Sequence, residues 1–266
     1  TTAALATAAG IGSMVPDRVS RISPPEGQVS RTDAPGLRSA RFPPLADTGR
    51  AASTIKPDPA FGYKGLLWDY RRLGLPAAWG TSAGRATVTV GVADTGVDFT
   101  HVDLKSSVVH VEDFTADDRP SACKAFLGPS APSDKDLARK FGGPAATDWN
   151  GHGSWIGGNI AAALNGTGTN GIAPKVGLVA LKIAENCGYA YDSDIIGSFV
   201  WAAKHGLDIV SISFGGYLDR ADPEQDAIYK VYAKAVSFAR SRGTLIVAAA
   251  GNEHLRLGSG GKVLSH

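Results

Sequence analysis

Three polar side chains stand where apolar stretches of the sequence begin or end, and their types suit acid–base chemistry. Asp94 follows the β-branched run 87–93, His152 lies between two glycines ahead of an apolar stretch, and Asn252 follows the apolar run 244–250. A carboxylate can orient an imidazole, the imidazole can move a proton, and an amide can stabilise developing negative charge. Taken alone, each residue also suits a turn, a helix cap or a packed side chain.

The elements predicted around these residues alternate between strands and helices. Apolar or β-branched runs predict buried strands at 87–93, 176–183, 207–214 and 244–250, and apolar spacing predicts helices after His152, over 194–205 and from Asp222 to Gly243. Asp222, Pro223 and Gln225 form a helix-start pattern with a cap and a capping-box partner. The sequence therefore predicts an α/β fold, with a mainly parallel sheet and helices on both faces.

The helix beginning near His152 is the element most directly tied to the proposed chemistry. Trp155, Ile156, Ile160 and Ala163 are predicted to form its buried face. The positive end of the helix dipole predicts that a resting imidazolium at His152 is disfavoured. The imidazole would then be available as a base.

Two domains are predicted. Residues 1–62 are proline-rich and poorly periodic, which predicts extended or disordered chain, and 63–266 are predicted to fold. The small-residue stretch 1–9 suits either a signal-peptide remnant or a flexible tail. The net charge of +2 argues against nucleic acid or an anionic membrane as partners, and no apolar stretch is long enough to span a bilayer.

Residues 113–148 are predicted as a long loop with one helical turn at 136–141. Cys123 lies in this loop, and Cys187 is the other cysteine of the chain. Two cysteines suit either a disulfide in an exported protein or two free thiols in a cytosolic one, and their number does not decide between these.

The three motifs Asp94-Thr-Gly, Gly-His152-Gly-Ser and Ala-Gly-Asn252 resemble those of subtilisin-like serine proteases, and the resemblance covers residues 68–253. Asp94 and His152 follow the chain order of that family, in which the serine comes last. The resemblance implies peptide hydrolysis. His152 would be the general base, Asp94 would orient it, and Asn252 would donate to the oxyanion.

The resemblance also implies binding sites. Two segments would hold a peptide substrate as an added strand, namely Gly188, Tyr189 and Ala190, and Ser213, Phe214 and Gly215. For Phe214, a core position and a pocket wall are equally expected. Asp103 and Asn165 fall where many relatives bind calcium. The mostly exported family implies secretion and favours a disulfide between Cys123 and Cys187. No cofactor is required for the chemistry.

The sequence also departs from the family. The serine motif expected after Asn252 is not found, so the nucleophile is expected outside residues 1–266, on a C-terminal segment or separate chain. Trp155 replaces a smaller or imidazole residue and is expected to narrow the cleft.

Three alternatives to a protease remain. The first is a non-catalytic subtilisin-like scaffold that binds peptides or a partner chain. The second is a metal hydrolase, which would use the Asp and His residues at 94, 98, 101, 103 and 152. The third, a nucleotide-binding domain, is disfavoured because no phosphate-binding glycine motif follows a strand.

Overall fold

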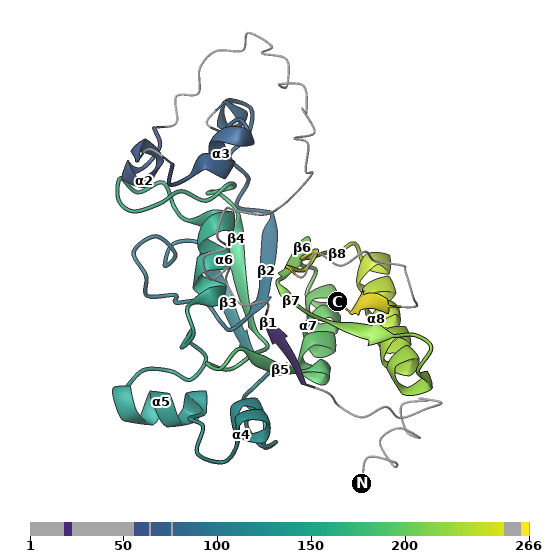
Figure 1. Cartoon of the computed structure of the whole chain (residues 1–266). Coiled ribbons are helices and arrows are strands. Elements are labelled where there is room, and N and C mark those ends of the chain that lie inside the picture. The colour runs from purple at the N-terminus through teal and green to yellow at the C-terminus, as the bar shows by residue number, and fades with distance from the viewer. Residues whose placement is uncertain (1–18, 23–55, 64, 76, 253–261, 266) are drawn as a thin grey trace, which may run out of the picture.

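The computed structural model describes residues 19–22, 56–63, 65–75, 77–252 and 262–265 (Figure 1). In chain order the helices are α2 Pro59–Gly62, α3 Trp68–Arg72, the 3-10 turn η1 Ala78–Gly80, α4 Ala122–Leu127, α5 Asp134–Phe141, α6 His152–Ala161, α7 Asp192–Lys204 and α8 Pro223–Ser241. The strands are β1 Val19–Ile22, β2 Thr89–Asp94, β3 Val108–Asp113, β4 Gly177–Lys182, β5 Tyr189–Tyr191, β6 Ile209–Ile212, β7 Phe214–Asp219, β8 Leu245–Ala248 and β9 Lys262–Ser265.

A five-stranded parallel sheet forms the centre of the fold, with strand order β3-β4-β2-β6-β8. Helix α6 lies on one side of these strands, and α7 and α8 lie on the other (Figure 1). The predicted α/β class is confirmed. Strand β3 was not predicted, and the predicted strand 207–214 ends earlier, because Phe214 already belongs to a second sheet.

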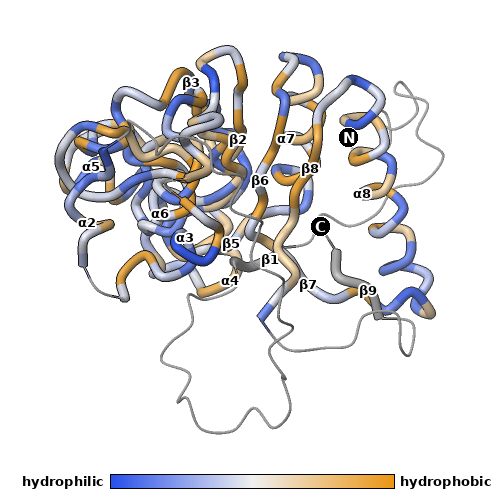
Figure 2. Tube along the Cα trace, turned by 90° about the horizontal axis from the view of Figure 1, so that it is seen from above, coloured by the Kyte–Doolittle hydropathy of each residue, from blue (hydrophilic) through white to orange (hydrophobic). Residues whose placement is uncertain are grey.

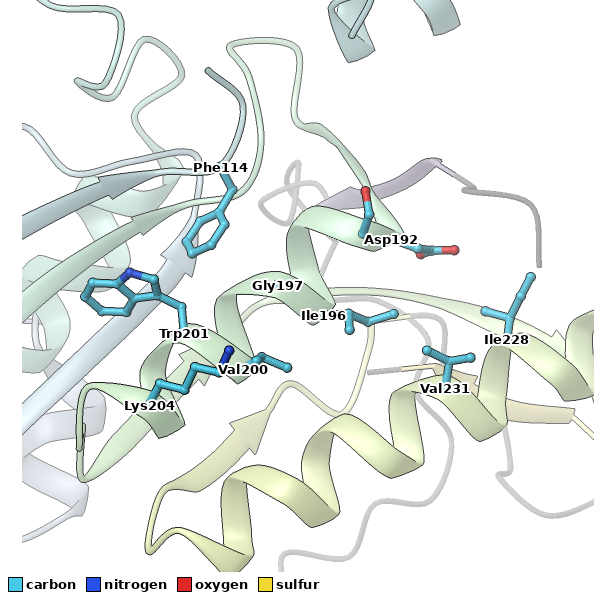
Figure 3. Close-up of a pocket in the computed structure, with 10 residues that line it drawn as sticks. Phe114, Asp192, Ile196, Gly197, Val200, Trp201, Lys204, Ile228 and Val231 are labelled. Carbon is cyan, nitrogen blue, oxygen red and sulfur yellow. The ribbon is translucent and has the colours of Figure 1, made fainter. Parts of the chain in front are cut away.

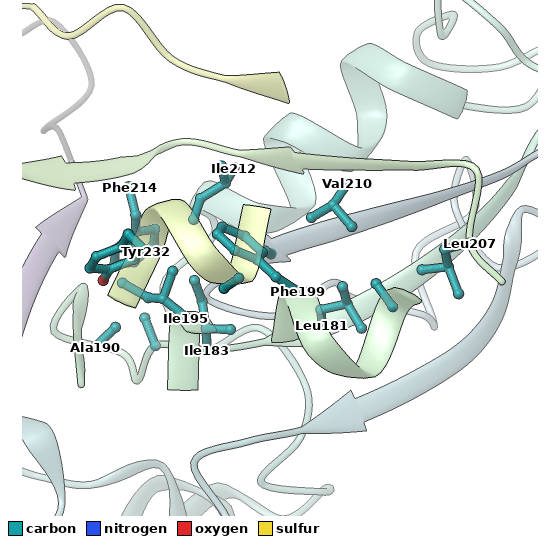
Figure 4. Packing of buried hydrophobic residues seen from close by; sticks show 14 of the residues in the cluster. Leu181, Ile183, Ala190, Ile195, Phe199, Leu207, Val210, Ile212, Phe214 and Tyr232 are labelled. Carbon is teal, nitrogen blue, oxygen red and sulfur yellow. The ribbon is translucent and has the colours of Figure 1, made fainter. Parts of the chain in front are cut away.

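Successive side chains of a strand point to opposite faces of the sheet, so apolar residues of one strand pack against helices on both sides. Val90 and Val92 of β2 pack on the α6 side, whereas Ala93 packs on the side of α7 and α8. Figure 2 shows hydrophobic stretches on β2, β6 and β8, between the helices of the two sides. The larger core cluster joins β4 and β6 to both helices, and Figure 4 shows Phe199 of α7 and Tyr232 of α8 among its members. The central strands β2 and β4 are buried on both faces and have the near-continuous apolar sequence that such burial requires.

A second, antiparallel sheet has the strand order β5-β1-β7-β9. Strands β1 and β9 were not predicted as elements: β1 lies in the segment predicted to be extended or disordered, and β9 lies near the end of the chain, where no element was predicted. Neither segment has a strong strand pattern of its own. Each acquires its backbone hydrogen bonds from β5 or β7, which are distant in sequence.

The folded unit also includes residues before the predicted start at 63. Phe61, Tyr70, Leu75 and Trp79 form a small buried cluster. Trp79 Nε1 donates to the carbonyl of Ile172, which fixes this cluster to the loop after α6.

The insertion, residues 113–148, contains two helices rather than one turn. Ser121 caps α4, and a capping box formed by Ser133 and Asp136 starts α5. Cys123 of α4 forms a disulfide with Cys187, across 64 residues of chain. Within the described residues, no helix is long and apolar enough to cross a membrane.

Candidate active site

The fold brings Asp94 and His152 into direct contact. Asp94 ends β2 and His152 opens α6, and His152 Nδ1 lies 2.8 Å from Asp94 Oδ1. Their side chains are 1% and 7% exposed. Because a carboxylate only accepts, Nδ1 carries the proton and donates it to Asp94. The other ring nitrogen, Nε2, is therefore left to accept a proton.

The charge balance at His152 differs from the prediction made from the helix dipole. Burial opposes the protonated ring, but the hydrogen bond that His152 donates to Asp94, the charge of Asp94 and the charge of Asp148 outweigh burial and raise the pKa of His152 above its usual value. The two nearby carboxylates favour the imidazolium. The expectation of a disfavoured imidazolium is therefore wrong.

Asp148 organises the turn that delivers His152. Its Oδ1 accepts from the backbone N–H of Gly151 at 2.8 Å, and its Oδ2 accepts from the N–H and hydroxyl of Ser154 at 2.8 and 2.7 Å. The Thr95 hydroxyl donates to Asp148 at 2.9 Å and accepts from the N–H of Gly153 at 3.0 Å. Asp148 and Thr95 were not predicted as site residues. Asp148 lies four residues before His152, outside the capping position occupied by Gly151, so no helix-capping pattern identified it.

Two glycines allow the end of β2 and the start of α6 to touch. A Cβ on Gly153 would lie 2.0 Å from the carbonyl oxygen of Gly96, which no relaxation of a side chain could relieve. Gly96 itself has a φ of 107°, a conformation that favours glycine. The glycines flanking the dyad are therefore needed for its 2.8 Å contact.

A buried ion pair between Lys182 and Asp134 lies next to the dyad and holds Thr95, the residue after Asp94. Lys182, at the end of β4 opposite Asp94, is 0% exposed and donates to the Thr95 carbonyl at 2.6 Å. Asp134 of the insertion, 3% exposed, lies 2.6 Å from the same Nζ. The insertion thus neutralises a lysine that holds the residue next to Asp94. Asp134 is remote in sequence, and no local pattern pointed to it.

The six residues predicted to bind substrate lie on or beside two strands that flank a third. Tyr189 and Ala190 belong to β5, with Gly188 just before it, while Phe214 and Gly215 belong to β7, with Ser213 just before it. Strand β1 lies between β5 and β7 and pairs antiparallel with both. Phe214 is 1% exposed and lies in the core, so it does not line a pocket (Figure 4).

Asn252 follows β8, just after Gly251, which has a φ of 84°. Because β2, β6 and β8 are parallel, their carboxyl ends meet at the same edge of the sheet. Asn252 is exposed and lies at the edge that carries Asp94.

Trp155 is 60% exposed, so the prediction that it faces the core is wrong. Gly153, Gly157 and Ala161 form the buried face of α6 instead, because small residues let the helix approach the sheet closely. The Trp155 ring lies 6.0 Å from that of His152 and borders the site.

The fold brings the two predicted calcium ligands, Asp103 and Asn165, next to each other. Asn165 turns its amide nitrogen, not its oxygen, toward Asp103 Oδ1 at 3.0 Å, and the N–H of Thr169 donates to Oδ2 at 3.1 Å. Calcium needs converging oxygens. Within the described residues, no group of three or more His, Cys, Asp or Glu side chains could hold a metal. The set expected for a metal hydrolase is therefore not assembled.

Two cavities lie beside the dyad rather than at it. One of about 590 Å³ lies between α7 and α8, with Phe114 and Trp201 toward one end and Ile228 and Val231 toward the other (Figure 3). Another of about 530 Å³ lies along α6, lined by Asp148, Ser154 and Trp155 among others. Neither contains His152, so we locate the site by the contact between Asp94 and His152.

Comparisons with known proteins identify the family of the chain. The model of the Subtilase family, peptidase S8, matches residues 85–265. Subtilisin DY of Bacillus licheniformis is 34% identical over 167 residues, 63% of this chain and 48% of that protein. The major intracellular serine protease of Bacillus subtilis (strain 168) is 32% identical over 182 residues, 67% of this chain and 47% of that protein.

Solved structures give the same result. Fervidolysin of Fervidobacterium pennivorans, a keratinolytic enzyme related to subtilisin, superposes with a TM-score of 0.51 at 25% identity, over 70% of this chain and 24% of that one. A lanthipeptide protease superposes with a TM-score of 0.56 at 23% identity, over 79% of this chain and 56% of that one. The chain belongs to the subtilase family of serine proteases. It spans about half the length of the curated relatives it matches.

Proposed function

We propose that the protein is a subtilisin-like serine endopeptidase in which Asp94, His152 and Asn252 serve catalysis. The observation that carries this proposal is the 2.8 Å contact between buried Asp94 and His152, at the carboxyl edge of a parallel sheet. Open α/β sheets place their sites at that edge. Membership of the subtilase family supports the same chemistry.

In this proposal a serine hydroxyl attacks the carbonyl carbon of a peptide bond. His152 Nε2 takes the hydroxyl proton and later gives it to the leaving amine, while Asp94 holds Nδ1–H and offsets the imidazolium charge. Asn252 donates its side-chain N–H to the oxygen that becomes negative. The serine belongs to a segment outside residues 1–266. Among the described residues, no serine, threonine or cysteine donates to Nε2 of His152.

We propose further that substrate binds as an extended strand between β5 and β7. The position of β1 supports this, because β1 lies between the two strands and pairs antiparallel with both. The N-terminal segment 1–62 would then act as a pro-segment that competes with substrate. Secretion is part of the same proposal and is supported by the disulfide, although the relatives include intracellular proteases.

A fluorophosphonate probe tests the catalytic proposal. We expect it to label the natural protein at a serine beyond residue 266, and His152→Ala to abolish both labelling and peptide hydrolysis while circular dichroism stays unchanged. His205→Ala, at the end of α7, is the matched control and should retain both activities. Labelling at a serine within 1–266 would show that the assignment of the nucleophile is wrong.

A non-catalytic peptide-binding scaffold is the second candidate. Binding of peptides by the natural protein without labelling or hydrolysis would support the scaffold over the protease.

A further inference from the structure

The insertion holds the strand that we propose lines one side of the substrate cleft. Cys187, just before β5, is joined by a disulfide to Cys123 of α4. Glu185 is 5% exposed and accepts from the Ser121 hydroxyl at 2.5 Å and from the N–H of Cys123 at 3.0 Å. The turn that leads into β5 is therefore fixed to α4 by a covalent bond and by two hydrogen bonds.

The second helix of the insertion holds the same turn from its other side. Asp134 of α5 accepts from both the backbone N–H and the side-chain amide of Asn186, each at 2.8 Å. With Glu185 and Cys187 also held, three successive residues ahead of β5 depend on the insertion. The position of β5 in the cleft is thus set by α4 and α5.

The insertion also contributes a side chain to this wall. The Phe126 ring of α4 lies over that of Tyr189 of β5, with a centroid separation of 4.2 Å and an interplanar angle of 31°. Phe126 remains 55% exposed. The two rings therefore form an aromatic surface at the beginning of β5 that solvent, or a ligand, can reach.

The register of the sheet identifies which peptide residue meets this surface. Residues directly opposite each other in an antiparallel pair project to the same face of the sheet. Tyr189 lies opposite Arg21 of β1, and Ala190, which is buried in the core, lies opposite Ser20. A peptide residue at the Arg21 position therefore projects to the face of Tyr189 and Phe126, and its neighbour projects toward the core.

We propose that Phe126 and Tyr189 form a subsite for a flat side chain, an arginine or an aromatic residue, at the peptide position opposite Tyr189. Guanidinium groups and aromatic rings both stack on exposed aromatic faces, whereas small or acidic side chains gain little there. This inference rests on the proposed binding of substrate as a strand between β5 and β7. It makes the insertion a determinant of substrate preference.

The test uses the protein carrying His152→Ala, so that no peptide is hydrolysed. Fluorescent peptides with the β1 sequence Val-Ser-Xaa-Ile, where Xaa is Arg, Phe, Ala or Glu, are titrated and their anisotropy is measured. Because β1 competes equally with all four peptides, the ratios of their dissociation constants are unaffected by it. We expect the Arg and Phe peptides to bind roughly threefold to tenfold more tightly than the Ala peptide, and the Glu peptide to bind no better than Ala.

Adding Phe126→Ala should reduce the affinities of the Arg and Phe peptides toward that of the Ala peptide, while leaving the affinity of the Ala peptide unchanged. Phe141→Ala is the matched control, since Phe141 is an exposed phenylalanine of α5 that contacts a different ring, Trp149. Equal affinities for all four peptides, or a preference that survives Phe126→Ala, would overturn the subsite alone. Failure of every peptide to bind would overturn the proposed cleft together with the subsite.

Discussion

Replacing Asp134 by asparagine should destabilise the protein far more than a usual change in an inserted loop. The substitution keeps the shape of the side chain and an oxygen that can accept from Asn186, but it removes the charge opposite Lys182. Lys182 is 0% exposed, and Asp134 Oδ2 has no hydrogen-bond partner in the described chain other than this ammonium group. The ammonium group would be left buried without a counter-charge.

The expected loss follows from the cost of leaving one member of a buried ion pair unpaired, about 3–5 kcal/mol of unfolding free energy. For a folded unit of this size, that corresponds to a decrease in Tm of roughly 6–20 °C. Urea unfolding followed by circular dichroism measures the free energy, and thermal unfolding measures the Tm. Peptide hydrolysis should fall as well, because Lys182 fixes the Thr95 carbonyl beside Asp94.

Two further variants separate charge from general damage. Asp226→Asn breaks ion pairs in which Lys230 is 65% exposed and Arg220 is 42% exposed, so its effect should be much smaller. The double variant Asp134→Asn with Lys182→Met removes the unpaired charge and should recover most of the stability lost by Asp134→Asn alone. An Asp134→Asn variant no less stable than Asp226→Asn would refute this reasoning.

Three other perturbations test the remaining features of the site. Gly153→Ala should abolish folding or activity, because the added Cβ would clash with the Gly96 carbonyl. Gly158→Ala in the same helix is the control, since a Cβ added there has nothing within 4 Å; it should be neutral or slightly stabilising in thermal unfolding. An NMR titration should give His152 a pKa above its usual value, and Asp94→Asn should lower that pKa; an unchanged value would contradict the proposed balance. Because the folded-state pKa of His152 is raised, its contribution to stability is full below the unfolded pKa of about 6.5 and is lost as the pH rises through the folded pKa. Arg21→Pro should displace β1, since proline is excluded from a strand that is paired on both edges. The displacement should speed amide hydrogen exchange in β5 and tighten peptide binding. Unchanged exchange would show that β1 does not occupy the cleft.

The parts of the site that were predicted from the sequence share one property, which is that their signals are local. Asp94 ends an apolar run and His152 stands between glycines at a helix start, so the neighbouring residues alone assign each to its element. The helix from Pro223 was likewise predicted from a local signal, because Asp222 caps it by contacts to residues at most three positions later. The α/β class followed from the same local patterns.

The parts that were missed depend on contacts between distant segments. In the sequence, Lys182 is simply a polar residue at the end of a strand. Its role depends on its ion pair with Asp134 of the insertion, which is distant in sequence. Strand β1 has no pattern that exceeds its proline-rich surroundings, and its pairing with β5 and β7 decides its conformation. The orientation of the Asn165 amide likewise depends on which atoms of Asp103 and the loop surround it, and the sequence alone does not give this.

Thr95 links these contacts between distant segments to the pair formed by Asp94 and His152. Its carbonyl accepts from Lys182, its hydroxyl donates to Asp148 and accepts from Gly153, and its own N–H donates to Asp94 Oδ1 at 2.7 Å. The insertion acts on Thr95 from one side and the start of α6 acts on it from the other. Since Thr95 Oγ1 donates one proton and accepts another, valine in its place would lose both bonds at similar volume, whereas serine would retain them. Thr95→Ser should therefore preserve the raised pKa of His152. Thr95→Val should lower activity, although neither the carboxylate of Asp94 nor the imidazole of His152 has changed. Equal activity in the two variants would show that Thr95 contributes only its volume.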